Sequence, residues 1–281
     1  MALHRLTAFT ERPDGGNPAG VWIGDELPDP AIMQRIAAEA TCSVTAFVVP
    51  ATGRERTVRY YSPEIEVPFC GHATIASGVV LGGMEGAGVY RFSTAVGVVS
   101  VALRRKGALW EASLTSIQPR HEPAPSALVD EALAALNWRR DELNDSIPPT
   151  RIYAGSWHLL LAAATSARLA ALDYDFERLK RVMLAHDLAT LQLVWREDAG
   201  LYHSRNPFPV GGIVEDPATG SAAAALGGYL RDTGRVNPPA RILIRQGEAM
   251  GRPSRLIVDI PQRGGIVVTG AAVPIDTEER S

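Results

Sequence analysis

The chain has 281 residues, of which 46% are hydrophobic and 21% are charged, and its formal net charge at pH 7 is −3. This composition is typical of a globular protein and is long enough for one large domain or two small ones. It contains no basic stripe that would favour nucleic acid. Its longest apolar run, around residues 159–165, is far shorter than the roughly 20 residues of a membrane span.

The chain has two cysteines, Cys42 and Cys70, so we predict no disulfide framework and a reducing, cytoplasmic location. Neither cysteine belongs to a C-x-x-C pair and the histidines lack H-x-x-x-H spacing, so we expect no bound metal ion. The N-terminal segment has no long apolar core before a cleavage site, so we expect no secretion signal. Cys42 leads into a strand and is interpreted as a packing residue.

The first predicted helix covers residues 29–40, with Asp29 as its N-cap and Pro30 at its first position. Short runs of β-branched or alternating apolar residues, bounded by Gly, Pro or Asp, predict strands along much of the chain. The apolar face of the helix holds Ile32, Ile36 and Ala37. The predicted strands cover residues 20–23, 46–49, 57–61, 97–103, 191–195, 241–244, 255–260 and 265–269, and two further helices are predicted at 126–136 and 176–184.

Two more predicted helices follow Gly71 and Gly220 and are made almost entirely of Ala, Gly, Ile, Val and Leu. A helix that is apolar on all sides is usually buried. The proline-rich segment 119–125 is a candidate crossover between two domains, each of which would hold one of these helices. The sequence therefore predicts two strand-rich domains, residues 1–118 and 119–281, each wrapped around one central helix.

The two central helices begin alike, with Gly71-His72-Ala73 in one and Gly220-Ser221-Ala222 in the other. A helix N-terminus has unpaired N–H groups and a partial positive charge, and small residues there let an anion approach the backbone. If the two ends face each other, they form one cleft that suits a small carboxylate-bearing substrate.

Three titratable residues flank these helix starts. The helix lowers the expected pKa of Cys70, which makes the thiol a candidate for proton transfer. Asp216 is a candidate acid or base if its pKa is raised. His72 is expected to titrate near neutral pH, so it could hold or move a proton.

Each of these residues also has a structural interpretation. Cys70 could be a small buried hydrophobe, and Asp216, which precedes a proline, could simply shape a turn. Thr219 and Ser221 could cap the second helix, which does not exclude ligand binding. His72 alone would more often be structural. The pairing of the two segments is what favours the functional interpretation.

Four motifs together resemble the phenazine-biosynthesis PhzF-like isomerases, within the diaminopimelate epimerase superfamily. They run nearly from end to end of the chain and occur in the family's order. The motifs are Gly16-Asn17-Pro18-Ala19-Gly20-Val21; Ser62-Pro63-Glu64-Ile65-Glu66-Val67 leading into Cys70-Gly71-His72-Ala73-Thr74; Glu215-Asp216-Pro217-Ala218-Thr219-Gly220-Ser221-Ala222; and Gln246-Gly247 with Gly251-Arg252-Pro253-Ser254.

The resemblance implies an α+β fold of two similar domains, each a barrel-like, mostly antiparallel sheet around a central helix, in which the last strand could return to the first domain. It also implies a homodimer and cofactor-independent proton transfer at carbon. Cys70 matches the first cysteine of the superfamily's C-G-[NH] motif, and Asp216 takes the place of the second. The implied catalytic residues are Asp216, His72 and Cys70, and the implied substrate-binding residues are Ser221, Gly220, Gly71, Ala73, Thr219 and Asn17.

The sequence departs from the family at one position. The family's S-E-T-x-F pattern carries its principal acid/base glutamate, whereas this chain has Val44 there, and valine cannot transfer a proton. The segment around Arg205 is also altered. Cys70, Asp216 and His72 could run a different isomerisation, the cleft could bind without turnover, or Glu39 or Glu66 could substitute for the missing acid.

The leading hypothesis is an isomerase or epimerase that shifts a proton on a small amino or carboxylic acid. The second is a non-catalytic protein that binds a small carboxylate. Hydro-lyase or decarboxylation-linked chemistry is a further enzyme class, but no residue favours it. A nucleotide-binding enzyme and a serine hydrolase are disfavoured, because G-x-x-x-x-G-K-[ST], G-x-G-x-x-G and G-x-S-x-G do not occur.

Overall fold

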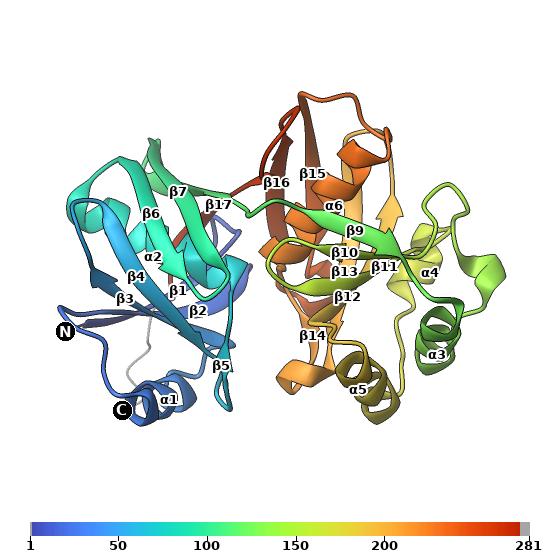
Figure 1. Cartoon of the computed structure of the whole chain (residues 1–281), viewed down its shortest axis with the longest axis horizontal. Coiled ribbons are helices and arrows are strands. Elements are labelled where there is room, and N and C mark those ends of the chain that lie inside the picture. Colours follow the sequence, from blue (N-terminus) through green and yellow to red (C-terminus); the bar gives the residue numbers. More distant parts are fainter. Residues whose placement is uncertain (1, 276–281) are drawn as a thin grey trace.

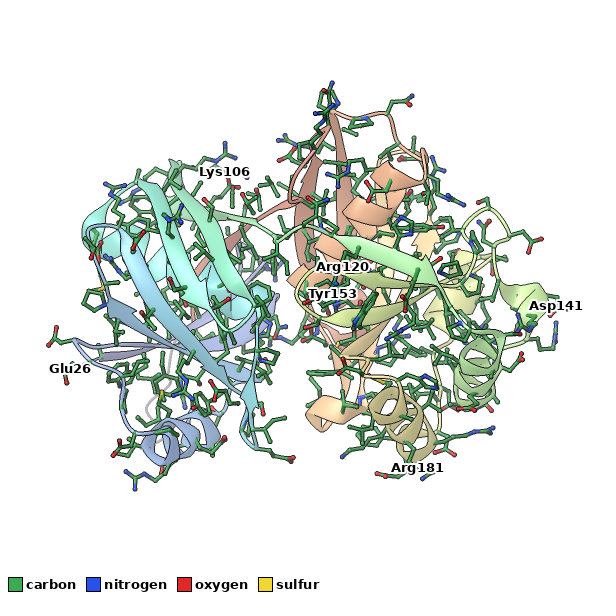
Figure 2. The ribbon with its side chains drawn as sticks, in the orientation of Figure 1. Glu26, Lys106, Arg120, Asp141, Tyr153 and Arg181 are labelled. Atoms are coloured by element: carbon green, nitrogen blue, oxygen red, sulfur yellow. The ribbon has the colours of Figure 1, made fainter. Side chains whose placement is uncertain are left out.

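The computed structural model describes residues 2–275 and has two lobes, each built around one central helix (Figure 1). The first lobe is a closed barrel of eight strands, and the second is a curved sheet of similar design. This confirms the predicted α+β class with two barrel-like halves. Charged side chains such as Glu26, Asp141 and Arg181 point outward at the periphery (Figure 2).

The first barrel is mostly antiparallel, with parallel pairs only where β2 meets β3 and where β4 meets β6. Helix α2 (Gly71–Glu85) runs through its interior, and every residue from Gly71 to Gly82 is buried. Helix α1 (Pro30–Glu39) covers the outside. In order around the barrel the strands are β1 (Ala2–Ala8), β2 (Asn17–Ile23), β3 (Val44–Pro50), β4 (Glu55–Tyr61), β6 (Gly88–Thr94), β7 (Gly97–Lys106), β8 (Leu109–Thr115) and β17 (Val267–Pro274), and the short β5 (Glu66–Val67) pairs with β4.

The second sheet wraps around α6 (Gly220–Asp232), and its outer face is covered by α3 (Ser126–Leu136), α4 (Ser166–Ala170) and α5 (Phe176–Ala185). Its strands in order are β9 (Arg120–Pro123), β10 (Thr150–Tyr153), β11 (Trp157–Ala162), β12 (Thr190–Arg196), β13 (Leu201–Phe208), β15 (Ala240–Gln246) and β16 (Ser254–Ile260), with β14 (Ile213–Asp216) paired to β13. Three short 3₁₀ helices lie at Arg140–Glu142, Pro209–Gly211 and Glu248–Met250.

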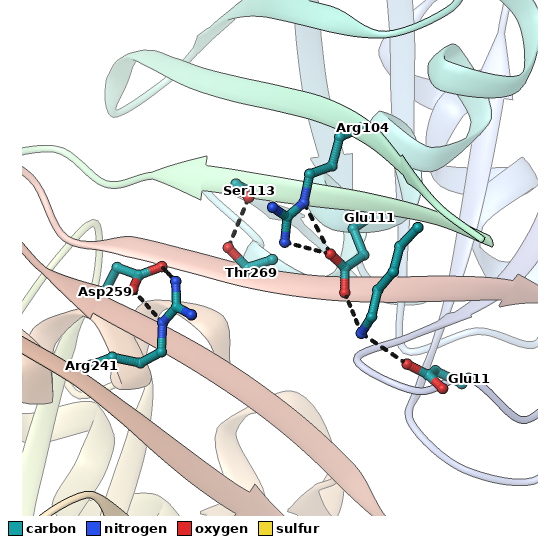
Figure 3. A network of polar contacts seen from close by, with 8 residues as sticks. Glu11, Arg104, Glu111, Ser113, Arg241, Asp259 and Thr269 are labelled. Carbon is teal, nitrogen blue, oxygen red and sulfur yellow. Dashed lines mark hydrogen bonds and ion pairs between the residues drawn. The ribbon is translucent and has the colours of Figure 1, made fainter. Parts of the chain in front are cut away.

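Strand β17 joins the two halves. Its first residues pair with β16 on one side and β8 on the other, and its last residues pair with β1. At this seam the hydroxyls of Ser113 and Thr269 lie 2.8 Å apart, and Arg104 holds the buried carboxylate of Glu111 (Figure 3). A single apolar cluster extends through both central helices. The lobes are therefore joined by a shared strand and a shared core.

Several predicted elements agree with the structure and others do not. The helix predicted at 126–136 has those bounds, and the one predicted at 29–40 is α1. Its apolar face was predicted correctly at Ala37, which is buried, but wrongly at Ile32, which is exposed while Met33 is buried. The predicted crossover at 119–125 in fact contains strand β9. The domain boundary after residue 118 stays a prediction.

None of the helices within residues 2–275 is long and apolar enough to cross a membrane. Cys42 is buried, as its interpretation as a packing residue requires, and burial raises its pKa.

Candidate active site

The two central helices meet at their N-termini, as the paired motifs predict. A Cβ atom added to Gly71 would lie 2.9 Å from Cα of Gly220 and 3.1 Å from the backbone nitrogen of Ser221. Real Cβ atoms do not approach backbone atoms this closely, so a side chain at Gly71 would force the helices apart. Glycine at both positions is what lets the two helix starts touch.

Backbone amides converge at this junction. The first helical hydrogen bond runs from Thr74 N–H to Cys70 C=O in α2, and from Ala223 N–H to Thr219 C=O in α6. The amides that precede these bonds, in the first turn of each helix, point out of the helix end. Two sets of N–H groups and two helix dipoles therefore act on the same small volume, which suits a carboxylate.

Asp216 ends β14 and lies beside this junction with its carboxylate buried. Asn17 Nδ2 donates to one carboxylate oxygen and the Thr219 hydroxyl donates to the other, each at 2.6 Å. Burial raises the pKa of Asp216 to about 6, while the two hydrogen bonds act in the opposite direction and the charge of Glu215 adds to the rise. This upward direction is the one that an acid or base role for Asp216 requires.

The residues around Asp216 hold its segment in place. Gln246 Nε2 donates to the Asp216 carbonyl at 2.7 Å, and Gln246 Oε1 accepts the Thr219 N–H at 3.1 Å. Arg205 Nη2 binds the buried Glu215 carboxylate at 2.6 Å, which places a cation next to the charge that adjoins Asp216. Thr219 precedes α6, but its side chain does not cap the helix. The capping interpretation of Thr219 is therefore wrong, and its hydroxyl positions the acid instead.

On the opposite side of the junction, Cys70 and His72 lie against each other. Cys70 Sγ is 3.2 Å from His72 Nδ1, and His72 Nε2 is 3.0 Å from the Ser43 hydroxyl. The same hydroxyl lies 3.2 Å from Asn17 Oδ1. A continuous chain of polar contacts therefore links the Cys70 thiol to the Asp216 carboxylate.

Two pKa predictions for these residues are wrong. The pKa of Cys70 is raised, because burial outweighs the backbone N–H groups of Ala73 and His72, and the charge of Asp216 adds to the rise. Burial also lowers the pKa of His72 to about 3. Near neutral pH the thiol is therefore protonated and the imidazole is neutral.

Neutral His72 carries a proton on one ring nitrogen, so one nitrogen donates and the other accepts. If the thiol donates to Nδ1, then Nε2–H donates to Ser43, and Ser43 donates to Asn17 Oδ1 or to the Pro18 carbonyl, 3.1 Å away. In this arrangement the imidazole holds the thiol in one orientation. These contacts of a neutral imidazole suit an orienting role for His72 better than the proton transfer that the sequence suggested.

Val44 is buried in the same apolar cluster as Cys70. The two carboxylates considered as substitutes for a missing acid lie on the surface. Glu39 is exposed at the end of α1, and Glu66 is bound by Arg59 at 2.7 Å. Within residues 2–275, the carboxylate that lies at the helix junction in hydrogen-bond contact with Asn17 is Asp216.

The remaining motif residues also have defined places. Ser221 is half-buried at the start of α6 and Ala73 is fully buried in the first turn of α2. Arg252 Nε donates to the Gly16 carbonyl at 2.8 Å, so the last motif fastens the loop that leads into Asn17. The structure therefore brings all four motifs to one place.

Sequence reasoning missed Ser43 and the side chain of Gln246. Ser43 directly precedes Val44, so its position in the segment compared with S-E-T-x-F was the available signal. Gln246 was noted as part of a motif, but its bonds to Thr219 and Asp216 depend on the parallel pairing of β13 with β15, which no local pattern reveals.

Comparison with known proteins agrees with this geometry. The model of the PhzC-PhzF family, described as phenazine biosynthesis-like protein, matches residues 6–277. The chain belongs to the PhzC-PhzF family. A trans-2,3-dihydro-3-hydroxyanthranilate isomerase from Pseudomonas fluorescens is 34% identical over 256 residues, which cover 89% of this chain and 86% of that protein.

Solved structures show the same fold. A predicted epimerase from Pseudomonas aeruginosa matches with a TM-score of 0.86 at 24% identity, over 98% of this chain and 96% of that one. A protein described as a probable proline racemase from Agrobacterium radiobacter matches with a TM-score of 0.66 at 14% identity, over 99% of this chain and 94% of that one. At the level of the PhzC-PhzF family, these relations support a small-molecule isomerase.

Proposed function

We propose that the protein is a cofactor-independent isomerase or epimerase that moves a proton on a small amino or carboxylic acid. The observation that carries this proposal is the junction of α2 and α6, where the Asp216 carboxylate and the Cys70 thiol are linked through Asn17, Ser43 and His72. The substrate named for the Pseudomonas fluorescens relative, trans-2,3-dihydro-3-hydroxyanthranilate, is the first candidate for this chain.

Asp216 acts as the base in this scheme. With a pKa of about 6 it is largely ionised at pH 7 to 8, yet it is more basic than an ordinary aspartate. It takes a proton from a substrate carbon, and the electron pair of the broken C–H bond moves into the substrate's conjugated or carboxylate system. Asn17 and Thr219 fix the direction of the carboxylate oxygens.

Cys70 acts as the acid because burial keeps its thiol protonated. It gives the S–H proton to the carbon that is reprotonated, and the thiolate left behind is next to the His72 ring. The enzyme then has a protonated Asp216 and an anionic Cys70, and proton exchange with water restores the starting state. The first-turn amides of both helices stabilise the negative charge that develops on the substrate.

The proposal is tested by deuterium wash-in. The protein is incubated in D₂O with a panel of amino acids and cyclohexadiene carboxylates, and loss of C–H signals is followed by NMR. Exchange at one carbon of at least one acid is expected, because each proton-transfer cycle passes through solvent-exchangeable groups. Absence of exchange from every acid at high protein concentration contradicts the proposal.

A second function is favoured by Val44, a buried apolar residue at the position where the family resemblance implies a glutamate. In this alternative the cleft binds a small carboxylate and does not turn it over. Calorimetry would then show saturable binding of an acid that undergoes no wash-in.

Replacing Val44 with glutamate separates the two functions. If the wild-type protein only binds, Val44→Glu is expected to create exchange activity that the parent lacks, since a positioned acid or base contributes about 10²–10⁴-fold to a rate. If the wild type is an enzyme that uses Asp216 and Cys70, Val44→Glu is expected to bring no such gain. The control is Val44→Gln, which adds a similar volume without an ionisable group.

The homodimer and the cytoplasmic location implied by the family resemblance stay predictions.

A further inference from the structure

A cluster of buried polar side chains lies on the inner face of the second sheet, beside the proposed active site. Its members come from β11, β12 and β13 and are His158, Thr190, Gln192, Ser204 and Asn206, all at most 3% exposed. The neighbouring residues on the same strands that face outward, such as Leu191 and Leu193, pack in the apolar layer beneath α3 and α5. Burial of so many polar groups is costly unless they are paired.

The cluster is internally paired in a way that fixes where its protons lie. The two N–H groups of Asn206 Nδ2 go to Gln192 Oε1 at 2.6 Å and to Thr190 Oγ1 at 3.1 Å. Ser204 donates its hydroxyl proton to Asn206 Oδ1 at 2.9 Å and lies 3.4 Å from Gln192 Nε2. Thr190 therefore accepts from Asn206, and its own proton is left for His158.

The Thr190 hydroxyl is 2.8 Å from His158 Nδ1. A hydroxyl that accepted from both Asn206 and His158 would leave its own proton unpaired, so donation from Thr190 to Nδ1 is the favoured direction. Nδ1 is then the unprotonated nitrogen of a neutral imidazole, and the ring proton lies on Nε2. Burial keeps His158 neutral by lowering its pKa to about 3. His158 is therefore the N–H donor at the end of this series of hydrogen bonds.

That donor is buried and has no hydrogen-bond partner within residues 2–275. Other unpaired buried atoms lie elsewhere, among them the hydroxyls of Tyr202 and Tyr229. Tyr202 lies four residues before Asn206 on β13, toward the end of the barrel that faces away from the junction. Within residues 2–275, the His158 cluster adjoins Asp216 through Asn206, which lies opposite it on the neighbouring strand.

The continuity follows from strand register. Asn206 on β13 lies directly opposite Asp216 on β14, and directly opposite residues of an antiparallel pair project to the same face with Cβ atoms about 4.5–5.5 Å apart. Ser204 lies opposite Gln246, which binds the Asp216 carbonyl. On the other side, the turn that precedes His158 touches the first barrel, because a Cβ on Gly155 would lie 3.1 Å from Phe69, the neighbour of Cys70.

We propose that the Nε2–H of His158 is a specificity donor that binds an oxygen substituent of the substrate, on the side of the molecule away from the carboxylate held by the helix N-termini. This inference rests on the proposed function. A hydroxyl or carbonyl oxygen supplies the acceptor that His158 lacks, whereas a hydrogen at the same place leaves the donor buried and unpaired. A buried donor without a partner is costly, so the cluster discriminates against acids that lack the oxygen.

The experiment compares two ligands that differ by one hydroxyl group. The probes are 3-hydroxyanthranilate, the aromatic counterpart of the compound in the relatives' name, and anthranilate, which lacks the hydroxyl. Calorimetry with the wild-type protein is expected to show about tenfold tighter binding of 3-hydroxyanthranilate. His158→Phe, which keeps a ring and removes the donor, is expected to bind the two equally. His121→Phe, the same change at an exposed histidine, is expected to keep the preference.

NMR of the wild-type protein gives a readout that does not depend on the variants folding. The nitrogen correlations of His158 are expected to show the Nε2–H tautomer, and Thr190→Val, which removes the proton that selects it, is expected to give a mixture. The Nε2–H proton is expected to move downfield with 3-hydroxyanthranilate and not with anthranilate.

Three outcomes overturn the inference. They are equal binding of the two ligands to the wild type, a preference that persists in His158→Phe, and an Nδ1–H tautomer in the wild type. Each of these leaves the proposed carboxylate cleft standing. If neither ligand binds, the inference fails, whereas the proposed function is decided separately by the wash-in panel.

Discussion

Asp216→Asn is expected to slow deuterium exchange at the substrate carbon by about 10²–10⁴-fold, the usual contribution of a positioned acid or base. The substitution keeps the shape of the side chain and removes the group that takes the proton. It acts directly on the reacting atoms, because the Asp216 carboxylate lies at the junction of the two helices and is held there by Asn17 and Thr219. The measurement is the wash-in rate under single-turnover and steady-state conditions.

The matched control is Asp141→Asn, the same change at an aspartate on the outer surface that pairs only with Arg139 (Figure 2). It is expected to leave the exchange rate unchanged. An Asp216→Asn protein that exchanges as fast as the wild type would remove Asp216 from the mechanism.

The pH profile gives an independent check on Asp216. Exchange needs the carboxylate form, so kcat/KM is expected to fall as the pH drops through about 6, the pKa that burial gives this residue. His72 contributes no change in this range, because its pKa is lowered to about 3. A profile that is flat between pH 5 and 8 would contradict the assignment of the base.

The titration of Asp216 is also expected to change the stability of the protein with pH, in the direction opposite to its effect on activity. The pKa of Asp216 is higher in the folded protein than the ordinary aspartate value of 3.8, so folding favours its protonated form. The stability that Asp216 contributes is fully present below about pH 4 and is lost as the pH rises through about 6. The free energy of unfolding of the wild type, relative to Asp216→Asn, is therefore expected to decrease across that range in denaturant titrations.

The sequence predicted the helix junction because its signal is local. Glycine followed by small residues at the start of an apolar helix indicates both a buried helix and an approachable N-terminus, and the pattern occurs twice, at Gly71 and at Gly220. The convergence of the two motifs then followed from the family resemblance. The α+β class with barrel-like halves was predictable on the same grounds.

The electrostatics of the site were not predictable, because they depend on the whole barrel. A helix N-terminus lowers a thiol pKa, but at Cys70 burial in the core and the nearby charge of Asp216 outweigh this effect. For the same reason His72, which has an ordinary titration in solution, stays neutral. Burial determines the pKa of both residues. No local sequence pattern indicates whether a single polar residue is buried.

The strands of the second sheet were the hardest elements to predict. Strand β11 is buried on both faces, so its apolar run at residues 159–162 lacks the alternation that indicates a strand. Strand β13 carries Ser204 and Asn206 toward the interior, where a sequence pattern leads one to expect apolar side chains. The polar cluster was therefore invisible until the strand pairing was known.

After Asp216→Asn, Gly71→Ala is expected to cause the largest loss of exchange activity. The added methyl group would lie 2.9 Å from Cα of Gly220, and because that neighbour is backbone, the two helix starts must move apart. Overpacking of this kind costs about 1–3 kcal/mol of stability. A misplacement of about 1 Å at reacting groups can cost about 10²-fold in rate. We therefore expect Gly71→Ala to lower the exchange rate by about 10²-fold while most of the protein stays folded.

Gly83→Ala is the matched control, because Gly83 belongs to the same helix but is exposed and has nothing within 4 Å of an added Cβ. Alanine in an exposed helical position is worth about 0.5–1 kcal/mol over glycine, so this variant is expected to be slightly more stable and fully active. Comparison of the two variants thus separates the effect of spacing between the helix ends from the effect of alanine on helix stability. Equal activity of the two variants would mean that the chemistry does not depend on how closely the helix N-termini approach, and the junction would lose its place as the active site.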